Sequence, residues 1–285
     1  MVALAAVLWA LLGPLTTELF DEGVDASTIA FWRAAIAGAL FVAHGLVTGT
    51  LRRPVGREPF VLAGFAVVGV AVFYSSLPRA VDAGGVGLAA ILLYSAPLFV
   101  ALASRLLFGD VLDRRRVVPV VATVVGVGLV ALGAGGTVER PGPALFWGLT
   151  AGLTYASYYV VGRLLGPGYG PAATYAIAFP LGALLLLPAA DPDVGSSRAW
   201  LLVAVIGVVS TYLAYLCFAT GLRLVDPTRA SVVATLEPVV ATALGAALYD
   251  ERLGAVTLLG GLIVVGSAAV SASGTRAGAV DPAAD

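Results

Sequence analysis

The sequence of 285 residues contains no lysine, because all sixteen of its basic residues are arginine. This absence excludes chemistry that needs a lysine side chain, such as phosphate binding in a P-loop and Schiff-base formation with pyridoxal phosphate or retinal. One histidine, His44, and one cysteine, Cys217, are too few to bind zinc, haem or an iron–sulfur cluster, and they exclude a disulfide within the chain. We therefore expect a protein without a metal ion or cofactor.

Charged residues are also scarce. They make up 12% of the chain, about half of the roughly 25% that is typical of soluble domains. Hydrophobic residues make up 60%, and the mean hydropathy is +0.99. One soluble core cannot bury this much apolar surface, so the lipid bilayer must surround most of the chain. The net charge of −1 shows no excess of basic residues, and we expect no nucleic-acid partner.

Long apolar runs account for most of the chain. A helix needs about 20 largely apolar residues to cross the hydrocarbon core of a bilayer. Ten such runs, separated by clusters of Pro, Gly, Asp and Arg, predict an all-α integral membrane protein with short loops and no soluble catalytic domain. We place the ten transmembrane helices at 2–20, 27–48, 59–78, 85–108, 116–134, 142–164, 171–188, 198–221, 228–249 and 253–272.

The arginine residues are concentrated on one side of these predicted helices. With a cytoplasmic N-terminus, 11 of them lie in inner segments and 4 in outer segments. Because basic loops stay in the cytoplasm, this distribution predicts that both termini are cytoplasmic. The absence of lysine together with abundant Ala, Val, Gly and Arg is typical of a GC-rich prokaryotic genome, so we expect the plasma membrane.

The two halves of the chain repeat one another. Five residue pairs are each 141 positions apart, and Trp9 and Trp147 are near-equivalents at 138; the five pairs are Tyr74/Tyr215, Ala89/Ala230, Pro97/Pro238, Asp110/Glu251 and Leu112/Leu253. Five helices per half is an odd number, so the second half starts on the opposite side of the membrane, and the repeats are inverted. We expect one repeat at 1–137, a second at 138–273 and a disordered cytoplasmic tail at 274–285.

Several motifs carry a resemblance to a known family. The second half has Leu-Glu-Pro-Val at 236–239, followed by Ala-Leu-Tyr-Asp-Glu-Arg-Leu at 247–253. The first half has Leu-Tyr-Ser-Ala-Pro-Leu at 93–98 and Leu-Leu-Phe-Gly-Asp at 106–110, and Phe-Trp-Arg occurs at 31–33. These segments resemble the EamA-type family of the drug/metabolite transporter superfamily. The chain departs from the family's common Glu-Arg-Leu at 110–112, where it has Asp-Val-Leu, and Ala96 stands at the position of Glu237.

The resemblance implies a secondary carrier that exports or exchanges small metabolites, often amino acids, by alternating access. The polar inventory of the spans argues against the first alternative, an intramembrane enzyme, because it offers no convergent nucleophile, base and metal ligands. A second alternative, a passive channel, usually needs charged rings or a filter of carbonyl groups, which the sequence does not suggest. We expect a small-molecule substrate and lipid as partners, and a monomer or homodimer.

Glu237 is the one carboxylate predicted near the middle of the membrane. A charged carboxylate there is costly, and it usually faces protein or water. It is either a site that carries a proton or binds a substrate ammonium group, or a structural residue that is hydrogen-bonded beside the kink at Pro238.

Arg33 is predicted one to two turns inside the outer face of the second span. From that depth its long side chain can reach the membrane interface, which is the favoured interpretation. The alternative is that it lines the outer cavity and binds a substrate carboxylate, for which the planar guanidinium is suited.

Aromatic residues are the remaining candidates for substrate binding. The pairs Tyr155/Tyr158 and Tyr212/Tyr215 have the spacing of a shared helical face. With other rings they could line a weakly polar pocket, although Tyr and Trp also favour the membrane interface. The predicted substrate-binding residues are Trp9, Arg33, Tyr74, Tyr94, Trp147, Tyr155, Tyr158, Tyr212, Tyr215 and Glu237.

Overall fold

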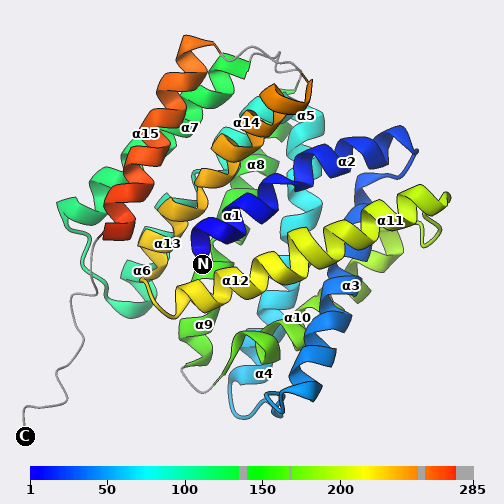
Figure 1. Ribbon diagram of the computed structural model, residues 1–285. Coiled ribbons are helices and arrows are strands. Elements are labelled where there is room, and N and C mark those ends of the chain that lie inside the picture. Colours follow the sequence, from blue (N-terminus) through cyan, green and yellow to red (C-terminus); the bar gives the residue numbers. More distant parts are fainter. Residues whose placement is uncertain (135–139, 167–168, 250–253, 274–285) are drawn as a thin grey trace, which may run out of the picture.

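In the computed structural model, residues 1–134, 140–166, 169–249 and 254–273 are described, and every regular element among them is helical (Figure 1). The predicted tail at 274–285 and the motif residues 250–253 lie outside the described residues. The elements are α1 (Val2–Ala10), α2 (Leu12–Asp21), α3 (Ala26–Val47), α4 (Glu58–Phe65), η1 (Ala66–Val72), α5 (Phe73–Leu93), α6 (Ala96–Phe108), α7 (Arg114–Ala134), α8 (Pro141–Tyr155), α9 (Ser157–Leu165), α10 (Pro171–Leu186), η2 (Leu187–Ala189), α11 (Ser197–Val205), η3 (Ile206–Leu213), α12 (Ala214–Leu222), α13 (Pro227–Ala234), α14 (Leu236–Tyr249) and α15 (Ala255–Ser273).

Among the described residues, eight helical stretches are long and apolar enough to cross a membrane. Their bounds agree with eight of the predicted spans to within two residues, except that the third continues to Gly85. The other two predicted spans, 142–164 and 228–249, correspond to two pairs of shorter consecutive helices, α8 with α9 and α13 with α14. The protein is therefore an all-helical, multi-pass membrane protein.

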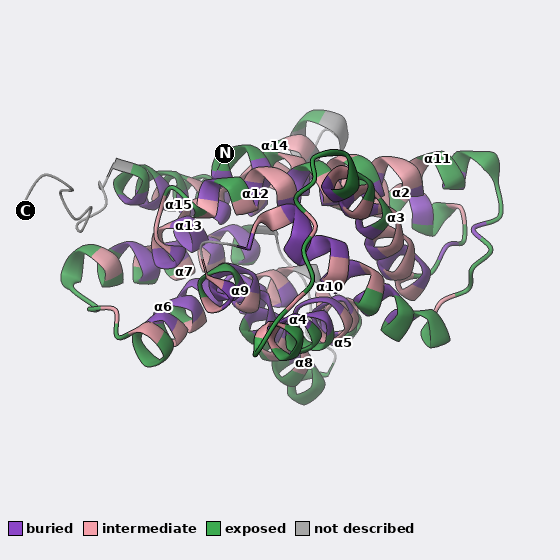
Figure 2. Cartoon of the chain, turned by 90° about the horizontal axis from the view of Figure 1, so that it is seen from below, coloured by how far each residue is buried: buried purple, intermediate pink, exposed green. Residues whose placement is uncertain are grey.

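The outward surfaces of the helices are apolar. Leu102, Leu184 and Leu262 are exposed, while the sides of the helices that face one another are buried (Figure 2). A soluble protein rarely exposes so many large aliphatic side chains in contiguous patches. The exposed leucines are therefore the surface that contacts lipid.

The third span is longer than predicted because Pro78 does not end it. The helix continues through this proline and breaks at Gly85, whose φ of 75° and ψ of 166° lie outside the helical region. A backbone with positive φ is accessible to glycine at little steric cost, and a side chain would strain it. The turn between the third and fourth spans is therefore set by Gly85.

Four spans are interrupted near their middle. The interruptions lie at Leu11, at Tyr94–Ser95, at Ala156 and at Thr235. Tyr94 and Thr235 are 141 residues apart, which is the offset of the sequence repeat. The backbone N–H groups of Tyr94, Ala156 and Thr235 still donate to carbonyls of the preceding turn, so these interruptions are local changes of helical geometry. Interrupted helices are common where a membrane protein binds a polar ligand.

Two π-helices also occupy corresponding positions in the two halves. η1 and η3 begin at Ala66 and Ile206, and each ends within two residues of one of the equivalent tyrosines Tyr74 and Tyr215. A π-helix shifts the side chains that follow it away from the regular helical stripe, and it is frequent at functional sites.

The structure does not support the equivalence of Trp9 and Trp147. Trp9 lies two residues before the interruption at Leu11, whereas Trp147 lies nine residues before the interruption at Ala156. The interruptions at Leu11 and Ala156 are 145 residues apart, so the position in the second half that corresponds to Trp9 is close to Tyr155. Aligned by their interruptions, the two spans therefore place Trp9 opposite the end of α8 and not opposite Trp147.

Candidate functional site

A cluster of buried rings lies where α1, α5, α8, α9, α10 and α12 meet. Tyr158 and Tyr215 stack with ring centroids 4.9 Å apart, and Trp9 contacts Tyr215 at 5.2 Å. Phe73 stacks on Tyr155, also at 5.2 Å. We call this group the central aromatic cluster; its members are Trp9, Phe73, Tyr74, Tyr155, Tyr158, Tyr175, Phe179, Tyr215 and Phe218.

Tyr74 and Tyr215 both point into this cluster, as equivalent positions in the two halves would require. They are 4% and 1% exposed, and their hydroxyl groups interact with one another. Rings buried to this degree cannot serve as anchors at the membrane interface. The π-helices directly before them explain why both rings turn inward.

Arg33, on α3, extends toward the same cluster and not toward the membrane interface. Its guanidinium carbon lies 4.3 Å from the centroid of the Tyr74 ring, the geometry of a cation–π contact. It also interacts electrostatically with Tyr158, Tyr215 and Glu237. The favoured sequence interpretation, a side chain reaching the interface, is therefore wrong for the observed conformation.

Glu237 lies in the first turn of α14, next to the interruption at Thr235. The N-terminus of a helix carries a partial positive charge, which stabilises a carboxylate at this position. The Glu237 carboxylate interacts with the hydroxyl of Tyr94, which lies at the corresponding interruption in the first half. The two interrupted spans therefore contribute a hydroxyl and a carboxylate to one place.

Five of the ten buried side-chain polar atoms that lack a hydrogen-bond partner among the described residues lie at this site. Among the described residues, the Trp9 Nε1, the Arg33 Nε and the hydroxyls of Tyr74, Tyr155 and Tyr158 are buried and make no hydrogen bond of normal geometry. Other tyrosine hydroxyls lie near those of Tyr74, Tyr155 and Tyr158 but not in that geometry. Each unsatisfied buried group costs about 1–3 kcal/mol. A group of them in one place indicates a site built for a polar ligand.

Known proteins share both the sequence and the fold. The model of the EamA-like transporter family matches residues 1–132 and 142–273. The chain belongs to the EamA-like transporter family. An uncharacterized transporter of Archaeoglobus fulgidus is 26% identical over 264 residues, which cover 93% of this chain and 92% of that protein. The uncharacterized transporter YwfM of Bacillus subtilis is 31% identical over 134 residues, 44% of each chain.

One solved structure, entitled "Crystal structure of protein", has the same fold. It superposes with a TM-score of 0.80 at 20% sequence identity, over 95% of this chain and 94% of that one. This EamA-like transporter therefore has the helical arrangement of that solved protein. A sequence identity of 20% carries no information on substrate.

Two of the predicted site residues lie away from the central aromatic cluster of the EamA-like transporter. Trp147 packs against Phe146 and under the guanidinium of Arg79, at 5.1 Å. Tyr212 forms a 2.7 Å hydrogen bond with His44. The expected stripe of Tyr212 and Tyr215 does not form, because Tyr212 lies inside η3 and Tyr215 lies after it. The other predicted residues lie in or next to the cluster.

The sequence interpretation missed several rings of the cluster. Phe73, Tyr175, Phe179 and Phe218 all contribute. Tyr175 and Phe179 are four residues apart, which places both on one face of α10. That spacing was the available signal, but it does not distinguish a binding site from an ordinary core.

Ion pairs connect the helix ends of the EamA-like transporter. Where α2 meets α11, Arg198 pairs with Glu18 and Glu22. Hydrogen bonds from Ser196 and Arg198 lower the pKa of Glu22 below its usual range. These contacts join the first span to the eighth.

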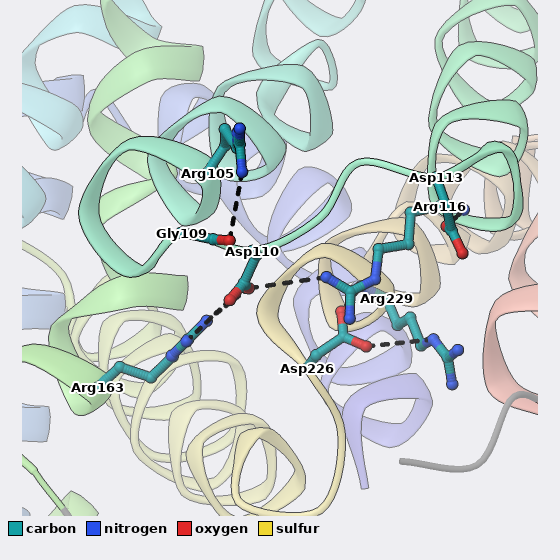
Figure 3. A network of polar contacts seen from close by, with 8 residues as sticks. All are labelled: Arg105, Gly109, Asp110, Asp113, Arg116, Arg163, Asp226 and Arg229. Atoms are coloured by element: carbon teal, nitrogen blue, oxygen red, sulfur yellow. Dashed lines mark hydrogen bonds and ion pairs between the residues drawn. The ribbon is translucent and has the colours of Figure 1, made fainter. Parts of the chain in front are cut away.

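A second network lies where α6, α7 and α9 meet (Figure 3). Arg163 donates two hydrogen bonds to Asp110, at 2.7 and 3.1 Å, and Arg116 approaches the same carboxylate. The Arg163 hydrogen bonds lower the pKa of Asp110. The motif residue Asp110 is therefore a structural partner of Arg163.

Proposed function

We propose that the protein is a secondary transporter of small organic metabolites such as amino acids, and that it works by alternating access. The observation that carries the proposal is the central aromatic cluster, where unsatisfied buried polar groups meet two interrupted spans. Membership of the EamA-like transporter family supports the same conclusion. Export or exchange is the direction that we propose, in line with the family resemblance.

We further propose ten spans in two inverted five-helix repeats, with both termini in the cytoplasm of the cell's plasma membrane. The family model matches two consecutive segments, 1–132 and 142–273, which supports the two-repeat organisation. The interruptions at Tyr94 and Thr235 are separated by the same 141 residues as the sequence repeat. The 11 to 4 distribution of arginine supports the orientation.

In this mechanism the rings hold the substrate body, while Arg33 and Glu237 bind its polar groups. The cluster is closed in the observed conformation, because Tyr158 and Tyr215 are fully buried. The substrate therefore enters after one end of the bundle opens, and it leaves after that end closes and the other opens. The ion pairs of Arg198 and of Asp110 lie at helix ends, where such movements would separate them.

Counterflow in proteoliposomes across a panel of amino acids, with and without a pH gradient, tests the function. A carrier exchanges labelled for unlabelled substrate, whereas a passive channel shows no counterflow and an enzyme changes the compound. Reporter fusions at the C-terminus test the orientation: a fluorescent fusion should be bright and a phosphatase fusion inactive. An active phosphatase at that position would contradict the ten-span topology.

The role of Glu237 in coupling has its own test. We expect that Glu237→Gln abolishes accumulation driven by a pH gradient but retains counterflow, because glutamine keeps the shape and hydrogen bonding and cannot carry a proton. Asp193→Asn, in an exposed loop, is the matched control and should behave as wild type. Wild-type accumulation by Glu237→Gln would leave Glu237 a structural partner of Tyr94.

A further inference from the structure

Arg33 differs from the arginines that pair with a carboxylate at the helix ends. Arg163 and Arg198 each pair with a carboxylate at a helix end. Arg33 has no carboxylate within ion-pair distance among the described residues, and its Nε is buried without a hydrogen-bond partner. A charge in the membrane interior is costly and is usually paired, so an unpaired one marks a functional site.

The cation–π contact with Tyr74 does not satisfy the hydrogen-bonding capacity of the Arg33 guanidinium, whose Nε is buried without a hydrogen-bond partner. The Tyr74 ring covers one face, at 4.3 Å, and such a contact does not use the N–H donors at the edge of the guanidinium plane. These donors are arranged as a fork that matches the two oxygens of a carboxylate.

The other unsatisfied groups around Tyr215 can each donate a hydrogen bond. The indole Nε1 of Trp9 can only donate, and the hydroxyls of Tyr74 and Tyr158 can donate. Trp9 and Tyr158 both contact the Tyr215 ring, and Tyr74 and Arg33 interact with Tyr215 electrostatically. A ligand group with several acceptor lone pairs can accept hydrogen bonds from these donors together, and a carboxylate, with about four lone-pair sites on two oxygens, is such a group.

The carboxylate of Glu237 does not neutralise Arg33 directly. The two groups form no ion pair among those of the described residues, and the Glu237 carboxyl group lies near the Tyr94 hydroxyl. The site therefore holds a guanidinium and a carboxyl group at separate positions, with aromatic rings nearby. A ligand with its own carboxylate can bind at Arg33 without displacing Glu237.

We propose that Arg33 determines substrate specificity by binding a carboxylate of the transported compound, an inference that rests on the proposed transport function. Substrates are then carboxylates with an apolar or aromatic body, with or without an amino group. An amine of the same shape that lacks the carboxylate is rejected, because Arg33 and its neighbouring donors would be left unsatisfied on a closed, water-excluded site.

Four matched probes test this proposal by competition for counterflow and by thermal stabilisation of the full-length protein in detergent. Phenylalanine carries both groups, 3-phenylpropionate only the carboxylate, phenethylamine only the amine, and phenylalaninamide has the carboxylate replaced. We expect the two carboxylates to bind at least tenfold more tightly than the two compounds without one. Equal or tighter binding of phenethylamine would overturn the proposal.

The variant that connects the preference to Arg33 is Arg33→Gln. We expect it to lose the tenfold or greater preference for carboxylates, and Arg33→Lys, which keeps the charge but not the fork, to retain part of it. Arg79→Gln is the matched control, because Arg79 also lies over an aromatic ring, that of Trp147, away from the cluster. An unchanged preference in a folded Arg33→Gln variant would also overturn the proposal.

The wild-type comparison of acid and amine stands even if Arg33→Gln does not fold. No counterflow with any amino acid or with these probes would refute the proposed function, and this inference with it. Counterflow that is indifferent to the carboxylate would refute only the role of Arg33.

Discussion

The first and second halves of the molecule use the same backbone devices and different side chains. Both have a π-helix ahead of an inward tyrosine, η1 before Tyr74 and η3 before Tyr215. Both have a span interrupted at corresponding residues, Tyr94 and Thr235. Each half therefore brings an inward tyrosine and an interrupted span to the centre of the molecule.

The chemistry at these positions is not shared. Ala96 in the first half corresponds to Glu237 in the second at the offset of 141, and Arg33 corresponds to Ala178 at the offset of 145 shown by the interruptions. Each half therefore supplies one charge that the other lacks. A repeated backbone can therefore form a site whose two ionisable groups come from different halves, because a few residues differ between the repeats.

The last spans of the two halves, α7 and α15, pack closely at Gly126 and Gly260. A Cβ on Gly260 would lie 2.5 Å from the Gly126 carbonyl oxygen and 2.6 Å from the Val130 nitrogen, both backbone atoms. We expect Gly260→Leu to separate the halves here and to destabilise the protein by about 3 kcal/mol. Thermal melting in detergent measures the effect. Gly128→Leu, which has open space around it, is the control and should melt as wild type.

The turn that leads into the interrupted span is built differently in the two halves. In the first half it depends on Gly85, with φ of 75° and ψ of 166°. We expect Gly85→Ala to cost about 1–3 kcal/mol, because a side chain is strained in this region. Gly64→Ala, on a helix with open space, should not destabilise. Equal melting temperatures for the two variants would show that the turn tolerates a side chain.

In the second half the corresponding turn depends on Asp226, which accepts a hydrogen bond from the Arg229 backbone N–H at 3.0 Å. Asp226→Ala should destabilise by about 1 kcal/mol, because the first turn of α13 loses its cap. Asp226→Asn keeps a capping oxygen and should retain most of that stability. The same loss in both variants would assign the effect to the ion pair with Arg229.

The smallest expected effect concerns Arg57 and Arg198, which are 141 residues apart at the starts of corresponding spans. Arg198 pairs with Glu18 and Glu22, whereas Arg57 donates to the Leu164 carbonyl at 3.2 Å. We expect Arg198→Gln to lower the melting temperature slightly more than Arg57→Gln at neutral pH. High salt should remove that difference, because exposed ion pairs are screened.

Acid should also remove the difference in melting temperature between Arg198→Gln and Arg57→Gln. The pKa of Glu22 is lowered in the folded protein, so this carboxylate stabilises the fold above its unfolded pKa of about 4.5 and loses that contribution as the pH falls through the folded value. A difference between the two arginine variants that does not shrink as the pH falls below 4.5 would show that the effect does not come from the carboxylate.

Much of the fold could be predicted from the sequence. Apolar runs with few charges predict membrane helices, and eight of the predicted spans are confirmed as apolar helices of sufficient length. The extent of the third span was not predictable, because Pro78 is a strong stop signal in isolation and neighbouring packing holds the helix together past it. The interruptions within α8/α9 and α13/α14 were not visible either.

The candidate site was predicted in part. Trp9, Tyr74, Tyr155, Tyr158 and Tyr215 meet in the cluster, but Trp147 and Tyr212 do not. Trp147 lies eight residues before Tyr155, toward the other end of α8, and Tyr212 lies inside the π-helix η3. Tyr175 and Phe179 look like ordinary core residues in the sequence.

By itself, the sequence determined that lipid surrounds most of this protein, because composition and the length of apolar runs are properties of the chain alone. The sequence also determined the family to which the protein belongs. Only the tertiary structure decided which polar residues meet. Arg33 at its depth could equally reach the interface or the interior, and contacts with Tyr74 from another helix placed it inside. Local sequence sets where a helix can form, whereas the direction of a side chain depends on breaks and neighbours that are distant along the chain.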